Sequence, residues 1–171
     1  NTDSWLGVVT RASILNTGAI DQSKGEYYLY KQGLTPSIFR CIEAVHKEKS
    51  ALFKVLGYND RYQIEFLQEV VRYTEFPELE IFRGLIGPTS MQHRYITEDA
   101  STTQSLIVSL GEMLNVPTPV IKALVILAST INQTNYLDEG RTVKQLGLSG
   151  LNADELNRFL AKGHWRSFTV R

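Results

Sequence analysis

Apolar side chains recur at helical spacing along most of the chain. The clearest run covers residues 35–56, with apolar positions at Ile38, Ile42, Val45, Leu52 and Leu56. Thr35 is a suitable N-cap, Pro36 fits the first helical turn, and Gly57 suits a C-terminal stop. The pattern therefore predicts one long amphipathic helix here.

The same pattern predicts further helices at residues 63–73, 78–85, 103–114, 120–131, 142–146 and 152–162. The segment 120–131 is apolar nearly all round, which is typical of a central helix. Asn152 and Glu155 form a capping-box pattern at the start of the last helix. Residues 26–30 are the best strand candidate, but no sheet is expected. We therefore predict an all-α fold in which residues 1–171 form a single multi-helix domain.

Composition and charge restrict the class of protein. The chain has 171 residues, and its 18 Lys and Arg balance its 18 Asp and Glu. This balance gives no electrostatic reason to expect nucleic acid or an anionic membrane as a partner. No apolar run approaches the length of about 18 residues that spans a bilayer, and no signal peptide is visible. The single cysteine, Cys41, excludes an internal disulfide, and a cytoplasmic location is expected.

Several common sites are missing from the sequence. It has no GxGxxG turn for a dinucleotide, no phosphate-binding P-loop and no GxSxG nucleophile elbow. The three histidines are scattered, so no metal site is predicted. The chain opens at Asn1 without a methionine, so we expect a further domain upstream.

One polar and aromatic segment, residues 87–99, lies between predicted helices. In it, Arg94 has the two-pronged donor geometry that binds a carboxylate, and Asp99 is suited to orient or polarise a catalytic histidine. His93 is a further candidate beside Arg94. From the residues alone, the favoured explanation of the segment is a helix entry with a surface arginine and two carboxylates just before a helix. Arg141, in a second polar cluster at residues 140–142, can likewise be a solvated charge beside a helix cap.

Five short motifs, in order along the chain, resemble the helical domain of the octopine/nopaline (opine) dehydrogenase family. The central one is RYITED at residues 94–99, similar to that family's RYxTED signature. The others are LNTG at 15–18, GEYYLY at 25–30, VPTP at 116–119, and GRTV with LGL at 140–148. The order and spacing of the five carry the resemblance, because each is modest alone.

The resemblance implies the C-terminal helical domain of a two-domain enzyme, with a fold like the C-terminal domain of 6-phosphogluconate dehydrogenase. An N-terminal Rossmann domain, absent from this chain, would bind NAD or NADP. The enzyme would join an amino acid to an α-keto acid by hydride transfer to an imine. Asp99 would be catalytic, and Arg94, His93 and Arg141 would bind substrate. The apolar helices could also form a homodimer interface, which the pattern does not separate from core.

One position departs from the family pattern. The resemblance places the family's acid/base histidine, which pairs with the motif aspartate, at Thr10, and its following proline at Arg11. A threonine hydroxyl hardly ionises near neutral pH, so it cannot replace an imidazole as acid or base. Either the register of the resemblance slips at this point, another group such as His93 substitutes for the histidine, or the chemistry differs. The alternative interpretation is a non-catalytic helical binding module descended from that domain.

Overall fold

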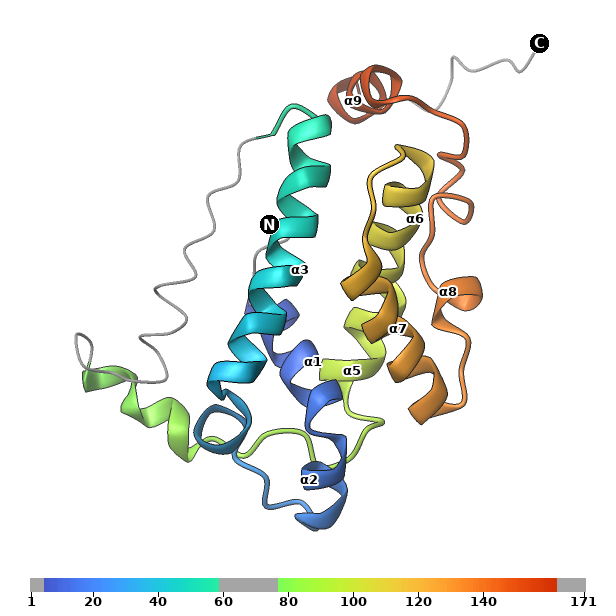
Figure 1. Ribbon diagram of the computed structural model, residues 1–171. Helices are drawn as coiled ribbons and strands as arrows, with labels where there is room; N and C mark the ends of the chain where they lie inside the picture. The colour runs from blue at the N-terminus through green and yellow to red at the C-terminus, as the bar shows by residue number, and fades with distance from the viewer. Residues whose placement is uncertain (1–4, 59–76, 163–171) are drawn as a thin grey trace.

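The computed structural model of the chain describes residues 5–58 and 77–162, and every regular element in these ranges is helical (Figure 1). The α-helices are α1 (Trp5–Leu15), α2 (Thr17–Gln22), α3 (Pro36–Val55), α5 (Arg94–Asp99), α6 (Ser105–Met113), α7 (Pro119–Asn132), α8 (Tyr136–Glu139) and α9 (Ala153–Lys162). Two π-helical turns, η1 (Leu29–Gly33) and η3 (Ala100–Gln104), and one 3-10 helix, η2 (Pro77–Gly84), complete the set. The all-α prediction is confirmed, and the helix predicted at 63–73 lies outside the described residues.

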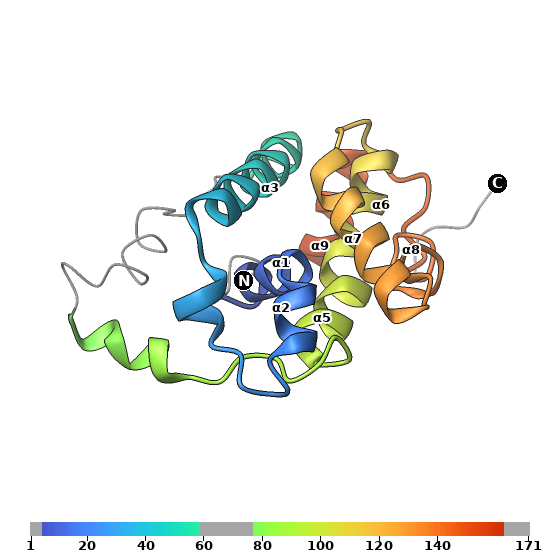
Figure 2. The same ribbon diagram turned by 60° about the horizontal axis from the view of Figure 1, so that its bottom comes forward.

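Helix α1 is the centre of the packing. It lies between α3 on one side and the α6 and α7 pair on the other, and it contacts α2, α3, α5, α7 and η1 (Figure 2). Every residue from 8 to 14 is buried, so this helix has no solvent face along that stretch. The sequence pattern did not predict α1, because three polar residues interrupt its apolar spacing: Thr10, Arg11 and Ser13.

The polar groups of α1 are buried and must be satisfied inside the fold. Ser13 is satisfied locally, because its hydroxyl donates to the carbonyl of Val9 one turn earlier, at 2.6 Å. Thr10 instead bonds a residue of α5, and this contact is the centre of the candidate site.

The long helix α3 begins and ends as predicted. Thr35 caps it, accepting from the backbone N–H of Ile38 at 3.4 Å, and Pro36 is the first helical residue. Gly57 follows with a φ of 77°, the left-handed conformation that glycine adopts without a side-chain clash. This helix also fixes α7, because the carboxylate of Glu48 accepts the backbone N–H groups of Val120 and Ile121 at 2.8 and 3.0 Å.

The segment 94–113 forms one unbroken helical run rather than a loop followed by a helix. Helix α5 passes directly into the π-helical turn η3 and then into α6. The prediction that Asp99 lies just before a helix is therefore wrong: it is the last residue of α5. The error has a physical cause, since residues 97–104 are almost all polar and show no apolar periodicity, although the hydroxyls of Ser101 and Thr102 support the helix by donating to the carbonyl of Glu98.

Two further expectations need correction. Helix α7 is amphipathic rather than central, because Ile126 and Leu127 are each 47% exposed while its other face is buried. Residues 142–146 form turns and no helix.

The capping box of α9 is confirmed, with Asn152 and Glu155 bonding each other's backbone N–H groups at 2.9 and 3.0 Å. Within the described ranges, no helix combines the length and apolar character needed to cross a membrane.

Substitution of Glu48 tests the link between α3 and α7. Glu48→Ala leaves two N–H groups at the α7 N-terminus without their acceptor, so the free energy of unfolding should fall by about 1–3 kcal/mol, as measured by denaturant titration. The control is Glu112→Ala, which breaks an exposed ion pair to Lys122 and should cost less than about 1 kcal/mol. Equal losses would show that Glu48 does not cap α7.

Candidate active site

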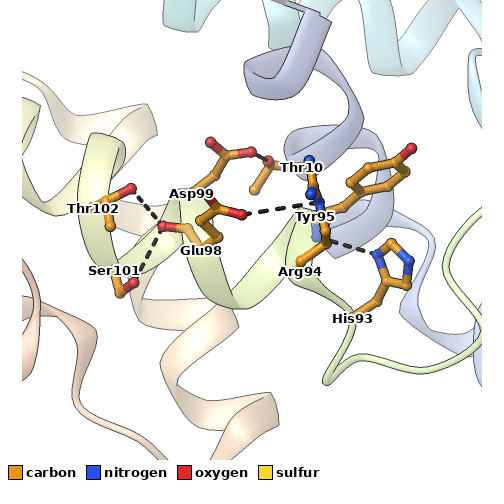
Figure 3. A network of polar contacts seen from close by, with 8 residues as sticks. All are labelled: Thr10, His93, Arg94, Tyr95, Glu98, Asp99, Ser101 and Thr102. Atoms are coloured by element: carbon orange, nitrogen blue, oxygen red, sulfur yellow. Dashed lines mark hydrogen bonds and ion pairs between the residues drawn. The ribbon is translucent and has the colours of Figure 1, made fainter.

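The candidate site centres on a hydrogen bond between α1 and α5. The hydroxyl of Thr10 lies 2.5 Å from the carboxylate atom Oδ2 of Asp99, to which it donates (Figure 3). Thr10 is completely buried and Asp99 is 7% exposed. Thus two of the predicted site residues, 89 positions apart in sequence, meet inside the core.

The surroundings of Asp99 act on its charge in opposite directions. Burial is the largest effect and raises the pKa of the carboxyl above 3.8, because desolvation penalises the charged form. The hydrogen bond from Thr10 lowers this pKa, the neighbouring carboxylate of Glu98 raises it, and the positive charges of Arg11 and Arg94 lower it. The pKa of Asp99 is raised on balance, so the folded protein holds this proton more tightly than an exposed aspartate does.

Arg94 lies on the exposed side of α5. Its side chain is 65% exposed, and its Nε is 3.9 Å from the carboxylate of Glu98 one turn along the helix. An exposed pair at that distance contributes at most about 1 kcal/mol. The guanidinium is therefore held only weakly by Glu98, and it lies at the surface where a small anion can reach it.

His93 is the N-cap of α5, and its role there is structural. Its Nδ1 accepts the backbone N–H of Tyr95 at 3.2 Å, and its ring lies edge-on to the Tyr95 ring with centroids 4.5 Å apart (Figure 3). A ring nitrogen that accepts carries no proton, so the imidazole is neutral with its proton on Nε2. Burial and the charge of Arg94 lower the pKa of His93, which favours this neutral form.

Arg141 is joined to the site region through its backbone rather than its guanidinium. Its N–H donates to the carbonyl of Ser101 at 2.6 Å, and its side chain is exposed. Gly140 allows this close approach, because a Cβ there would collide with the carbonyl oxygens of Tyr136 and Ser101. The geometry thus explains the Gly-Arg pair as a tight loop against η3, and it does not place the Arg141 side chain on Thr10 or Asp99.

Sequence reasoning missed two residues that the fold brings to this region. Arg11 is 6% exposed on α1, and its charge acts on Asp99. Gln104 is 2% exposed in the π-helical turn after Asp99, and its carboxamide makes no hydrogen bond with the described residues. π-Helical turns and unsatisfied buried amides both gather at functional sites. The available signal in the sequence was a polar residue at an otherwise buried position. Such a position on α1 can be recognised only once that helix has been predicted.

A comparison with known protein families identifies the family of this chain. The sequence model described as NAD/NADP octopine/nopaline dehydrogenase, alpha-helical domain, matches residues 8–132, which is well over half of the chain. The chain belongs to this family. The matched range holds Thr10, His93, Arg94 and Asp99, whereas Arg141 lies beyond its end.

Curated members of the octopine/nopaline dehydrogenase family are similar over most of the chain. An opine dehydrogenase from Arthrobacter sp. (strain 1C) is 37% identical over 134 residues, covering 75% of this chain and 37% of the relative. The protein named ocs from Agrobacterium vitis is 30% identical, covering 77% and 38%. A vitopine synthase from Allorhizobium ampelinum is 24% identical, covering 78% and 39%. The chain therefore spans less than two-fifths of the length of these relatives.

Within this family, the Thr10–Asp99 contact supports the placement of Thr10 at the family's histidine position. The resemblance implies that the motif aspartate pairs with the residue at that position, and Asp99 does contact Thr10. The roles of the five candidate residues, Thr10, His93, Arg94, Asp99 and Arg141, stay predictions.

Removal of the Thr10 hydroxyl should weaken the fold and raise the pKa of Asp99. Thr10→Val keeps the side-chain shape but leaves a buried carboxylate oxygen without its donor, at a cost of about 1–3 kcal/mol in the free energy of unfolding. Thr10→Ser keeps the hydroxyl and should cost less. Denaturant titration of both variants checks this, and a Thr10→Ser loss equal to that of Thr10→Val would rule out a role for the bond.

The raised pKa of Asp99 gives stability a defined pH dependence. Between pH 3.8 and the raised value, the folded state binds a proton that the unfolded chain has released. The contribution of Asp99 to the free energy of unfolding therefore falls as pH rises through this window. Asp99→Asn removes this titration, so the variant should lose less stability over the window than the parent protein. Denaturant titrations across the acid range measure the two slopes, and identical slopes would contradict the assignment.

Proposed function

We propose that the protein acts in an NAD(P)-dependent oxidoreductase of the opine dehydrogenase type, with this helical domain as its substrate domain. The reaction would be the reductive condensation of an amino acid with an α-keto acid. One observation carries the proposal: Asp99 of the RYITED motif and Thr10, at the family's acid/base position, are in direct contact between α1 and α5. The family match over residues 8–132 supports it.

The described residues include no Rossmann-type dinucleotide site. They contain no strand followed by a glycine-rich turn, which is how a dinucleotide-binding domain holds the pyrophosphate. The proposal therefore assigns NAD or NADP to an N-terminal Rossmann domain as a partner of this one. That cofactor would supply the hydride.

Arg94 is the candidate for holding a substrate carboxylate. Both substrates of the proposed reaction carry a carboxylate, and a guanidinium binds such a group through two parallel hydrogen bonds. The exposure of Arg94 and its long contact with Glu98 leave those donors accessible. His93 lies next to it, half-buried, with the Nε2 proton of its neutral ring as a further donor toward a substrate oxygen.

The proton chemistry must differ from that of a histidine-containing relative. The hydroxyl of Thr10 donates a hydrogen bond to Asp99, and the side chain is fully buried. Thr10 therefore neither ionises nor reaches a substrate in this arrangement. His93 is the described imidazole nearest in sequence to Asp99, and it is the candidate acid/base. Its lowered pKa leaves it neutral at pH 7, and its ring would accept a proton at Nδ1 only when that atom releases the N–H of Tyr95.

A second candidate function has one observation in its favour. The Thr10 and Asp99 pair is closed from solvent, and a threonine stands where the family pattern has an imidazole. A helical domain that keeps the fold but has lost the acid/base is expected to look like this. In that case the protein would be a non-catalytic binding module.

An assay of nicotinamide oxidation distinguishes the two functions. The intact two-domain enzyme, in which this helical domain is joined to the proposed Rossmann domain, should consume NADH or NADPH when it is supplied with an amino acid and an α-keto acid, whereas this helical domain alone is expected to be inactive. Asp99→Asn should lower turnover by about 10²-fold or more, the usual contribution of a group that supports proton transfer. The matched control is Asp138→Asn, an exposed carboxylate on α8, which should leave turnover near that of the parent.

Two results would count against the dehydrogenase. Unchanged turnover in Asp99→Asn would remove the catalytic role of that residue. No consumption of NADH or NADPH by the two-domain enzyme, across a panel of α-keto acids and amino acids, would favour the binding module.

A further inference from the structure

The corner between α7 and α8 contains a buried asparagine with three hydrogen-bond partners. Asn132 is the last residue of α7 and is 8% exposed. Its Nδ2 donates to the backbone carbonyl of Met91 and to the hydroxyl of Tyr136, each at 3.0 Å. Its Oδ1 accepts from the Nε2 of Gln92 at 3.2 Å. The carboxamide of Asn132 therefore joins residues that lie about 40 positions away in sequence to the corner.

Two of these three partners belong to the short segment that leads into α5. Met91 and Gln92 directly precede His93, which is the N-cap of α5, and Arg94, which is its first residue (Figure 3). Residues 89–93 form bends and turns rather than a helix. Because a turn has few backbone hydrogen bonds of its own, side-chain partners on another helix determine where such a segment lies.

The same corner also reaches the other end of α5. The hydroxyl of Tyr136 accepts from Asn132, and the backbone carbonyl of Tyr136 accepts from the hydroxyl of Ser105 at 2.6 Å. That hydroxyl also lies 2.6 Å from the carbonyl oxygen of Ala100, the residue that follows Asp99. Helix α5 is thus connected to the α7–α8 corner through Asn132 at its start and through Tyr136 at its end.

The two ends of α5 depend on this corner to different degrees. At the end, the hydrogen bond from Thr10 also holds Asp99 against α1. At the start, Arg94 has only its long, exposed contact with Glu98. A helix of six residues is too short to be stable by itself, so contacts with other elements must fix its first turn. The position of that first turn therefore depends more on Asn132 than the position of Asp99 does.

We propose that Asn132 is a positioning residue of the candidate site, which fixes the entry to α5 through Met91 and Gln92 and so determines where His93 and Arg94 lie. Asn132 acts through these residues and does not itself contact a reacting group. The part of the inference that concerns substrate rests on the proposed function, whereas the placement of His93 by Asn132 can be measured without it.

The direct test is the pKa of His93, measured by NMR titration of its ring protons in the full chain. Asn132→Leu keeps the branched shape of the side chain and removes all three hydrogen bonds. Burial is the main cause that lowers the pKa of His93, and the charge of Arg94 is the second. Release of the helix entry exposes the ring, so the pKa should rise toward its ordinary value of 6.5.

Tyr136→Phe is the matched control for this titration. It removes one of the hydrogen bonds of Asn132 but leaves those to Met91 and Gln92 in place. Both variants should lower the free energy of unfolding, whereas only Asn132→Leu should raise the pKa of His93. The proposal is overturned if this pKa is unchanged in Asn132→Leu, or if it rises equally in Tyr136→Phe, because Asn132 would then only stabilise the fold.

A milder variant covers the case in which Asn132→Leu does not fold. Gln92 is exposed, so Gln92→Ala removes one hydrogen bond to Asn132 without disturbing the core. It should raise the pKa of His93 in the same direction by a smaller amount. An unchanged pKa in Gln92→Ala would then overturn the proposal.

Kinetics of the intact two-domain enzyme test the link to substrate. If His93 and Arg94 bind substrate oxygens, Asn132→Leu should lower kcat/KM for the α-keto acid by about 10–10²-fold, because the donors are misplaced, and Tyr136→Phe should stay near the parent. An active enzyme in which Asn132→Leu leaves kcat/KM unchanged would overturn the positioning role. An inactive parent enzyme would instead count against the proposed function, and the titration of His93 would still decide the role of Asn132.

Discussion

A carboxylate enclosed between helices is the constraint on which the candidate site depends. Asp99 is at the end of α5 and is covered by α1, which is itself buried on every side between residues 8 and 14. Such a group is tolerated only where polar partners are built into the facing helix. Thr10 meets that need by donating its hydroxyl to Asp99, so this fully buried stretch of α1 also carries polar residues. The arrangement links the packing of the core to the ionisation of one site residue.

The sequence predicted those parts of the fold whose apolar spacing is regular. Helix α3 shows this, since Thr35, Pro36 and Gly57 mark its ends as expected. Helix α1 and the run that begins with α5 and η3 were not predicted, because polar residues interrupt their apolar spacing. Thr10 and Asp99 satisfy each other across the two helices. Ser13, Ser101 and Thr102 instead bond backbone carbonyls within their own helical run. The resemblance to the RYxTED motif brought Asp99 and Thr10 together before the structure did. It did not identify Arg11 or Gln104, whose burial depends on the packing of α1 and of the π-helical turn.

Membership of the octopine/nopaline dehydrogenase family and the chemistry at Thr10 give different indications about function. The family match covers the helices that carry the candidate site, and Thr10 of α1 donates a hydrogen bond to Asp99 of α5 there. The hydroxyl at this position nevertheless cannot accept and release a proton as an imidazole does near neutral pH. A dehydrogenase built on this domain would therefore rely on another group such as His93, and Arg94 would remain the surface donor for carboxylates.

The most direct test of this account is a double-mutant cycle between Thr10→Val and Asp99→Asn, measured as free energies of unfolding. If the two side chains are bonded across α1 and α5, the two effects will not add, and the coupling energy will lie between about 0.5 and 3 kcal/mol. Effects that add to within about 0.3–0.5 kcal/mol would show that the two residues do not interact. That result would contradict the placement of Thr10 against Asp99, and the site built on it.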